Sequence, residues 1–270
     1  MITSWNGLAI AAFADAGVIL GRPDLIEVAR ETAAFLLEGL VVNGRLMRVW
    51  ADGAARHLGC LDDYADLAHG LLVLYEATFE PRWLAAARDL TRRMLDLFAD
   101  PDGDGFFYAG SDAEELLART RDVEDHPTPG GNSQAAWVLL RLAALTGDDL
   151  LEERAAGALR LVGAEMGRYP QAFGTALVAL DFLTAARREV AIVGSAGEAR
   201  TRALVDVARD AAGPAAVIAA GDPDDAFAAE AAPLLAGRPR VDGAPAAYVC
   251  QRFACHAPVT EPDELRRALA

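Results

Sequence analysis

Residues 61–98 read LDDYADLAHGLLVLYEATFEPRWLAAARDLTRRMLDLF and hold two helical patterns in succession. The first pattern, about residues 62–79, is apolar nearly all round, which predicts a buried helix. The second, about residues 82–98, gathers Arg88, Arg92 and Asp96 on one face, which predicts a surface helix with an apolar stripe. An inner helix followed by an outer helix is the repeating unit of an α/α barrel or toroid.

The same alternation covers the chain up to about residue 187. We expect further inner helices at about residues 5–20, 133–146 and 173–185, and further outer helices at about 24–40 and 149–166. This amounts to about three and a half helical hairpins by periodicity. The sequence therefore predicts a mainly α fold, a partial α/α toroid of the six-hairpin type over residues 1–187.

Each expected inner helix begins with a polar or aromatic cluster. The clusters are Ser4-Trp5-Asn6-Gly7, Leu61-Asp62-Asp63-Tyr64, Gly131-Asn132-Ser133-Gln134 and Tyr169-Pro170-Gln171-Ala172. Alternate helices of an up-and-down array start at the same end, so the four clusters should converge on one rim. A hairpin with an Asn43-Gly44 turn and a short strand near residues 106–108 should decorate the same rim.

After about residue 187 the pattern changes to short β-rich runs and helices. Strands are expected near residues 189–194, 215–219 and 246–250. Helices are expected near residues 198–211, 225–235 and 262–269. This alternation predicts a small α/β C-terminal module with a parallel sheet, over residues 188–270.

Composition excludes several classes of protein. The 270 residues carry a formal net charge of −15, which argues against nucleic acid as a partner. No apolar stretch is a clean bilayer span and no signal peptide is evident, so we expect a cytoplasmic protein without a membrane partner. The three cysteines do not suggest a disulfide framework. Cys250, Cys255 and His256 match no zinc spacing, and no metal or cofactor is expected.

Asp62 and Asp63 are the strongest catalytic candidates. Two carboxylates at a helix start could serve as acid and base in sugar chemistry. Alternatively, Asp62 caps the helix and Asp63 favours its positive end. Adjacent helical residues point about 100° apart, so both should not easily face one substrate atom. His69 is a third candidate, as the base of an epimerase, although a histidine on an apolar helix is more often a core residue.

Five residues of the clusters are candidates for ligand binding. They are Trp5, Asn6, Tyr64, Asn132 and Gln134. An indole ring offers a stacking face, and the amides could hydrogen-bond sugar hydroxyls. The alternative is that Trp5 packs in the rim and that the asparagines cap helices.

Several motifs together resemble a known family. They are Thr3-Ser4-Trp5-Asn6-Gly7-Leu8, Leu61-Asp62-Asp63-Tyr64, Pro129-Gly130-Gly131-Asn132-Ser133, and the tail from Ala247-Tyr248-Val249-Cys250 to Cys255-His256-Ala257-Pro258-Val259-Thr260. The chain looks like the C-terminal part of the spermatogenesis-associated protein 20-like family. The resemblance implies an N-terminal thioredoxin-like domain followed by a six-hairpin toroid similar to that of N-acylglucosamine 2-epimerases and several glycosidases. That domain and the first toroid hairpins are absent here, so the resemblance implies a fragment and carries over no redox role from that domain.

Two hypotheses of function follow. In the first, the toroid is epimerase- or glycosidase-like and binds a small carbohydrate-like ligand, as an enzyme or an incomplete one. In the second, the chain is a non-catalytic binding or scaffold module. An incomplete toroid should also leave the helix at residues 5–20 without neighbours on one side, which predicts self-association through an exposed apolar edge.

Overall fold

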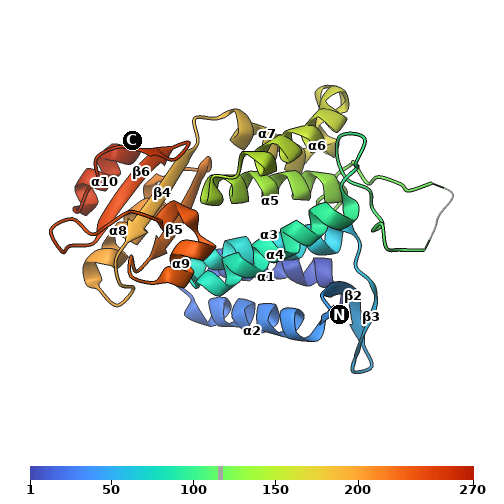
Figure 1. The fold of residues 1–270 in the computed structure, drawn as a ribbon, viewed down its shortest axis with the longest axis horizontal. Coiled ribbons are helices and arrows are strands. Elements are labelled where there is room, and N and C mark those ends of the chain that lie inside the picture. The colour runs from blue at the N-terminus through green and yellow to red at the C-terminus, as the bar shows by residue number, and fades with distance from the viewer. Residues whose placement is uncertain (115–117) are drawn as a thin grey trace. The chain divides into compact units, whose positions relative to one another are not determined.

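The computed structural model of the chain describes residues 1–114 and 118–270 (Figure 1). These residues form two compact units. The helical unit comprises residues 1–78, 82–140 and 151–180, and the α/β unit comprises residues 79–81, 141–150 and 181–270. Among the described helices, none is long and apolar enough to cross a membrane.

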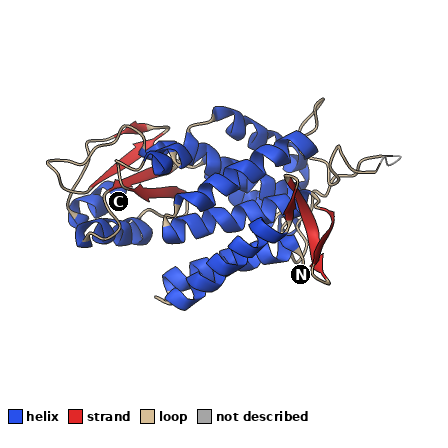
Figure 2. Cartoon of the chain, turned by 60° about the horizontal axis from the view of Figure 1, so that its bottom comes forward, coloured by secondary structure: helices blue, strands red, loops and turns tan. Residues whose placement is uncertain are grey.

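Among the residues that the structure describes, seven long helices follow one another in the first part of the chain (Figure 2). They are α1 (Thr3–Ile19), α2 (Pro23–Gly39), α3 (Leu61–Thr78), α4 (Pro81–Phe98), α5 (Gly131–Thr146), α6 (Asp149–Arg168) and α7 (Gly174–Thr184). A short 3-10 helix, Pro170–Ala172, precedes α7. All seven helices were predicted, and the fold is mainly α, a partial α/α toroid with a small sheet module.

Glycines bring the inner helices α1 and α3 into backbone contact. A Cβ atom added at Gly7 would lie 2.5 Å from the carbonyl carbon of Asp66, and one added at Gly70 would lie 2.4 Å from the carbonyl oxygen of Gly7. No side chain fits at either position without moving the helices apart. The two inner helices therefore lie side by side.

The two inner helices α3 and α1 differ in how far they are buried. The first four turns of α3 are almost entirely buried, as predicted for an inner helix. In α1, by contrast, Trp5 is 64% exposed and Ile19 79% exposed, and Phe13 on the same side is also exposed. The prediction of a buried helix is thus wrong for α1, whereas the expected apolar exposure along one side of this helix is confirmed.

A small antiparallel sheet lies at one end of the helices (Figure 2). It consists of β1 (Val41–Val42), β2 (Arg45–Ala51) and β3 (Ala54–Leu58). Asn43 and Gly44 have positive φ angles of 49° and 79°, so the predicted hairpin turn is confirmed. Strand β3 was not predicted. The strand expected near residues 106–108 is only an isolated bridge between Ala99 and Phe106.

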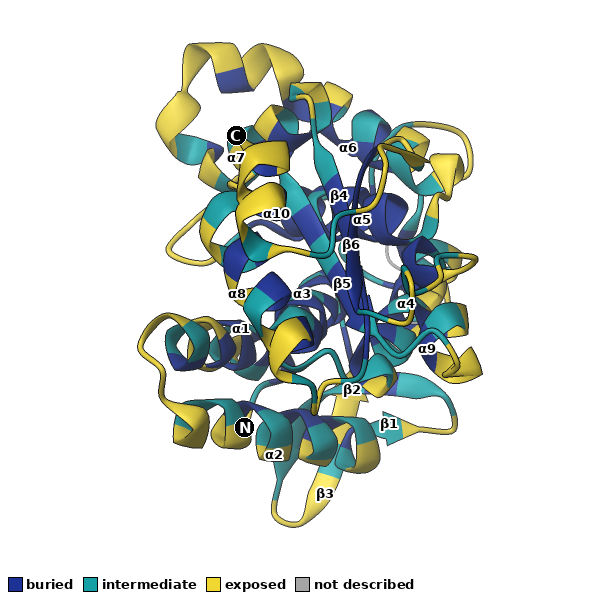
Figure 3. Ribbon diagram, turned by 90° about the vertical axis from the view of Figure 1, so that its left-hand side faces the viewer, coloured by how far each residue is buried: buried dark blue, intermediate teal, exposed yellow. Residues whose placement is uncertain are grey.

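The α/β unit contains a four-stranded sheet of order β5-β4-β6-β7. The strands are β4 (Arg188–Val193), β5 (Ala216–Gly221), β6 (Ala246–Gln251) and β7 (Ala254–Cys255), and the helices are α8 (Ala199–Ala211), α9 (Ala226–Ala231) and α10 (Pro262–Leu269). Strands β4, β5 and β6 are largely buried (Figure 3). Apolar residues of the sheet, including Val190 and Ile192, pack with Leu204 of α8 and Leu265 of α10.

Three predictions for this unit need correction. The sheet is not wholly parallel: β4 pairs parallel with β5 but antiparallel with β6. The connection between β5 and β6 is long enough for a crossover and contains a helix, but it returns β6 to the far side of β4 in the opposite direction. The helix expected over residues 225–235 is divided into α9 and a 3-10 helix, Pro233–Leu235, because Pro233 cannot donate a helical hydrogen bond. Finally, a disulfide joins Cys250 to Cys255, although the cysteine pattern had not indicated one.

Candidate functional site

The starts of the inner helices meet at one end of the helical unit. The amide of Ser4 in α1 donates to Oδ1 of Asp63 in α3 over 3.1 Å. A Cβ atom added at Gly131, the first residue of α5, would lie 3.5 Å from the amide nitrogen of Asp62. Asp125 accepts from the amides of Gly130 and Thr175, which links the start of α5 to that of α7. The predicted convergence of the helix starts is confirmed.

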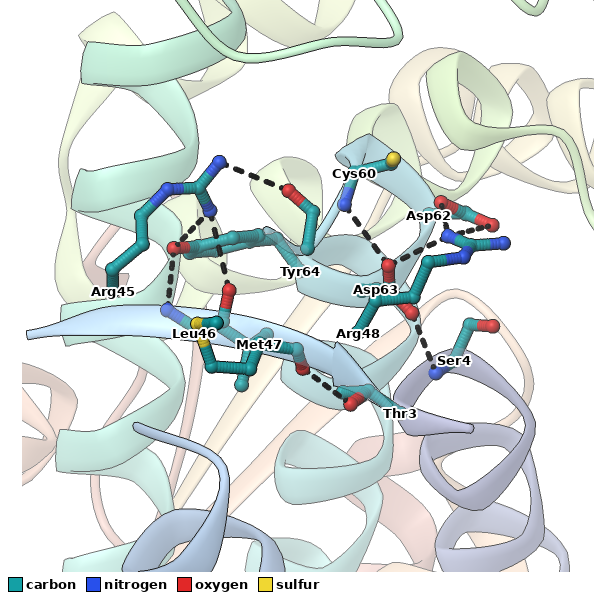
Figure 4. A network of polar contacts seen from close by, with 11 residues as sticks. Thr3, Ser4, Arg45, Leu46, Met47, Arg48, Cys60, Asp62, Asp63 and Tyr64 are labelled. Atoms are coloured by element: carbon teal, nitrogen blue, oxygen red, sulfur yellow. Dashed lines mark hydrogen bonds and ion pairs between the residues drawn. The ribbon is translucent and has the colours of Figure 1, made fainter. Parts of the chain in front are cut away.

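Arg48 of β2 binds both carboxylates at the start of α3 (Figure 4). Its Nη1 atom lies 3.0 Å from Oδ1 of Asp62 and 2.7 Å from Oδ2 of Asp63. We call these three residues the Arg48 cluster. Both carboxylates meet the same guanidinium nitrogen although adjacent residues of a helix point about 100° apart. The expectation that they should not easily face one substrate atom stays a prediction.

Asp63 closes the start of α3. It is the third residue of the helix, and its Oδ2 accepts from the amide of Cys60 over 2.9 Å, the geometry of half a capping box. Asp63, rather than Asp62, therefore provides the capping contact. The side chain is fully buried, and burial, followed by the charge of Asp62, raises the pKa of Asp63 to about 6 despite the opposing effect of Arg48.

Asp62 is the carboxylate of the cluster that solvent reaches. Its side chain keeps 20% of its surface exposed and that of Arg48 keeps 30%, whereas the side chain of Asp63 keeps none. Two weaker acids lie within electrostatic range: burial raises the pKa of the Cys60 thiol, and burial together with the charge of Asp62 raises the pKa of Tyr108. Both groups therefore stay protonated at neutral pH beside the exposed face of Asp62.

A metal ion fits this cluster poorly. Oxygen atoms of Asp62 and Asp63 and the sulfur of Cys60 lie within 4.8 Å of one another, which is close enough for shared ligation. The guanidinium of Arg48 already contacts both carboxylates, however, and supplies the positive charge. A second cation would have to displace Arg48 from a partly buried ion pair.

Asp66 is a buried acid that was not among the residues predicted from the sequence. It is only 2% exposed, and its Oδ1 atom is buried without a hydrogen-bond partner. Burial, followed by the charges of Asp62 and Asp63, raises the pKa of Asp66 to about 8, so the group carries a proton at neutral pH. Its spacing of three and four residues from the pair places it on the same helix face, a signal that was present in the sequence.

Two predicted ligand-binding residues are engaged within the fold. The hydroxyl of Tyr64 is buried and accepts from Nη1 of Arg45 and from the amide of Leu46 (Figure 4). The amide group of Asn132 accepts from the Phe106 amide over 2.8 Å and donates to the carbonyls of Phe106 and Asp122. A ligand would have to replace these contacts.

The other candidates occupy different settings. Trp5 is exposed, and Nδ2 of Asn6 donates to the carbonyl of Ile2 over 2.6 Å. Gln134 is buried with its Nε2 atom unpaired. His69 lies seven residues after Asp62, about 10 Å further along the helix axis. Binding by Trp5, Asn6 and Gln134 and catalysis by His69 stay predictions.

These features define the class of the protein as a helical-hairpin toroid whose inner helices start at a carboxylate–arginine cluster, followed by a small α/β unit. Spermatogenesis-associated protein 20 from Homo sapiens is 34% identical to this chain over all of its residues, and the protein of the same name from Rattus norvegicus is 33% identical. An uncharacterized protein from Caenorhabditis elegans is 26% identical over 98% of the chain. The chain is thus a homologue of spermatogenesis-associated protein 20 over its whole length, as its motifs indicated.

The chain spans 36% of the length of its human relative. No family model matches it. Among solved structures, a GH76 alpha-mannanase from Bacteroides thetaiotaomicron is similar at a TM-score of 0.49 and 16% identity, over 61% of this chain and 44% of that one.

Proposed function

We propose that the helix-start end of the helical unit forms part of a carbohydrate-processing site of glycosidase or epimerase type. The observation that carries this proposal is the Arg48 cluster at the start of inner helix α3. It presents a partly exposed carboxylate, Asp62, against a guanidinium that a second, buried carboxylate holds in place. A few fixed polar groups of this kind are what orient a sugar in a binding site.

Within this site each member of the cluster has a separate role. Asp62 accepts hydrogen bonds from sugar hydroxyls and is the group that can exchange a proton with a ligand. Asp63 positions Arg48 and the start of α3, because its carboxylate accepts hydrogen bonds from Arg48 and from the amides of Ser4 and Cys60. Its side chain has no exposed surface. The exposed indole of Trp5 offers an apolar face near the start of the neighbouring helix.

The same geometry explains why the isolated chain should bind without turnover. Glycoside hydrolysis uses two carboxyl groups that flank the bond being broken. Here the carboxylate of Asp62 is accessible to solvent, whereas that of Asp63 is fully buried. The second reacting group would come from another part of the longer protein, as the relatives' greater length allows.

Titration of common mono- and disaccharides, followed by tryptophan fluorescence and a product assay, tests this proposal. We expect saturable binding in the millimolar range, about −4 kcal/mol, and no product. Asp62→Asn and Trp5→Ala should each weaken binding. Asp24→Asn, which alters an exposed ion pair with Arg22 on α2, is the matched control and should bind as the parent does. Turnover by the isolated chain would refute the incomplete site, and unchanged binding by Asp62→Asn would refute the role of Asp62.

A non-catalytic binding or scaffold module is the second candidate. The contacts of Tyr64 and Asn132 favour it, because the polar groups of both side chains already hydrogen-bond to the protein's own backbone or to Arg45. Under this function no sugar would bind at Asp62, and the Arg48 cluster would serve only to fasten β2 to α3. Failure of every sugar to give a saturable response would select this alternative.

A further inference from the structure

A disulfide at the edge of the sheet in the α/β unit joins a buried sulfur to an exposed residue. Cys250 is the last buried residue of β6, whereas Cys255 lies exposed on the edge strand β7. We propose that Cys250 and Cys255 form a thiol–disulfide exchange site, in which a thiolate of a partner attacks the sulfur of Cys255. This inference is independent of the carbohydrate proposal, which concerns the helical unit.

A guanidinium contacts both sulfur atoms. Nη2 of Arg238 lies 3.1 Å from Sγ of Cys255 and 3.7 Å from Sγ of Cys250. Nε of the same side chain is buried without a hydrogen-bond partner, so its charge is poorly solvated. A neighbouring cation stabilises a thiolate and lowers its pKa, which makes a cysteine a better leaving group and favours the reduced state.

Glu189 is an acidic residue that interacts electrostatically with Arg238 and also has partners of its own. Glu189 of β4 is fully buried, accepts from the amide of Phe253 over 2.7 Å, and lies 3.5 Å from Nε of Arg187. Besides contacting the two sulfurs through Nη2, the Arg238 guanidinium donates from Nη1 to the carbonyl of Ala236 over 3.2 Å.

The bond stabilises the fold less than a disulfide that closes a long loop would. It closes a loop between residues only five positions apart, and such a short loop loses little entropy when it is cross-linked. The register of β6 and β7 already pairs Cys250 with Cys255 and Gln251 with Ala254.

The exchange balances with two thiols as reductant. A first thiolate attacks Sγ of Cys255, forming a mixed disulfide there and releasing Cys250 as a thiolate beside Arg238. A second thiolate then attacks the partner's sulfur in that mixed disulfide, so the partner's two sulfurs become joined and Cys255 leaves as a thiolate. Two electrons pass from the thiol pair to the Cys250–Cys255 bond, and the protons of the two thiols are released to solvent or taken up by the new thiolates. The reductant is either two molecules of a monothiol such as glutathione or one dithiol.

Equilibration of the folded chain with glutathione redox buffers, and separately with dithiothreitol, tests the proposal. Thiol alkylation and peptide mass spectrometry would report Cys250 and Cys255 separately from Cys60. We expect reduction without loss of the circular dichroism spectrum, by glutathione if monothiols suffice and by dithiothreitol alone if a dithiol is required. A disulfide that neither reagent reduces until the chain unfolds would overturn the proposal.

Substitutions of Arg238 test the role of the cation. Arg238→Gln should shift the equilibrium toward the disulfide by about tenfold, the effect of about one unit in thiol pKa. Arg238→Lys keeps the positive charge and should reverse most of this shift. A merely structural defect would not be reversed by lysine. Arg240→Gln, which removes a nearby guanidinium paired with Glu198, is the control and should leave the equilibrium unchanged. Equal shifts in Arg238→Gln and Arg240→Gln would overturn the role of Arg238.

The assignment of the attacked sulfur has its own test. In Cys250→Ser the remaining Cys255 should form a mixed disulfide with oxidised glutathione, whereas in Cys255→Ser the buried Cys250 should react more slowly. Equal rates in the two variants, or a faster Cys250, would contradict the assignment.

Discussion

The starts of α3 and α5 lie at the same end of the helical unit, yet their polar residues act differently. At the start of α5, Asn132 is buried and gives its hydrogen bonds to the backbone of Phe106 and Asp122. At the start of α3, Asp62 keeps part of its surface exposed against Arg48. The two helix starts differ in what they contact. The start of α5 contacts a loop whose backbone groups need hydrogen-bond partners, whereas the start of α3 contacts a strand that carries Arg48.

This comparison shows that the role of a polar residue at a helix start cannot be assigned from the residue type alone. Asn132 satisfies backbone groups that would otherwise be buried unpaired, so its energetic value is structural. Asp62 contacts a side chain that is already paired with Asp63, and its removal leaves no buried group alone. Substitution of each residue should therefore affect stability to a different extent.

The largest effect is expected for Asp63→Ala. This change would leave the buried amide of Ser4 and the half-buried amide of Cys60 without acceptors, and it would break the shorter of the two ion pairs to Arg48. Urea unfolding should show a loss of about 3 kcal/mol. Asp24→Ala, which removes an exposed ion pair with Arg22 on α2, is the control and should lower the free energy of unfolding far less. Equal losses in the two variants would show that Asp63 does not fasten α3.

A somewhat smaller loss is expected for Asn132→Ala. The amide and carbonyl of Phe106 and the carbonyl of Asp122 would lose their partner, so the free energy of unfolding should fall by about 2 kcal/mol. Asn6→Ala, which removes one partly exposed contact with Ile2, should cost less than half of that. If Asn132→Ala proves as stable as the parent, the start of α5 is free to serve a ligand and the comparison fails.

The pH dependence of stability should report Asp66. Its pKa is raised to about 8 in the folded chain and is about 4 when unfolded, so between these values only the folded state holds the proton. The contribution of Asp66 to the free energy of unfolding is therefore most favourable below about pH 4. It falls by about 1.4 kcal/mol per pH unit between about pH 4 and pH 8. In Asp66→Asn this slope should disappear. We would compare urea unfolding at pH 6.5 and 7.5, above the pKa of about 6 of Asp63; parallel slopes for parent and variant would contradict a protonated Asp66.

The exposed side of α1 carries the weakest of these expected effects. We propose that the isolated chain self-associates through Trp5, Phe13 and Ile19, which remain exposed on this helix. Sedimentation should show a concentration-dependent dimer whose dissociation constant rises about tenfold in Phe13→Glu, or about 1.4 kcal/mol. Val178→Glu, at an exposed apolar position of α7, should leave the dimer unchanged. A sharply monomeric parent would contradict this interface.

Much of the fold was predictable because its signals are local. Apolar periodicity located the seven long helices, and the Asn43-Gly44 turn located the first hairpin. Strand β3 was missed although Asp52-Gly53, with φ angles of 52° and 75°, is the same kind of turn signal. The direction of β6 could not be predicted, because it depends on how a long connection between β5 and β6 returns to the sheet.

The site was predictable only in part. Convergence of the helix starts follows from the up-and-down order, so Asp62 and Asp63 could be found. Arg48 could not, because it lies on a strand and meets the carboxylates only through tertiary packing. Asp66 could have been found from its spacing to the pair. The pairing of Cys250 with Cys255 depends on the β6–β7 register, which composition does not reveal.

The most direct test of the difference between the two helix starts is a titration of the isotopically labelled chain with the panel of sugars, followed by amide chemical shifts in NMR. If α3 presents the ligand-facing group, the shifts should centre on Cys60, Asp62 and Tyr108 and should vanish in Asp62→Asn, while the amides of Phe106 and Asn132 stay unchanged. Shifts centred on the start of α5, with none near Asp62, would contradict the account.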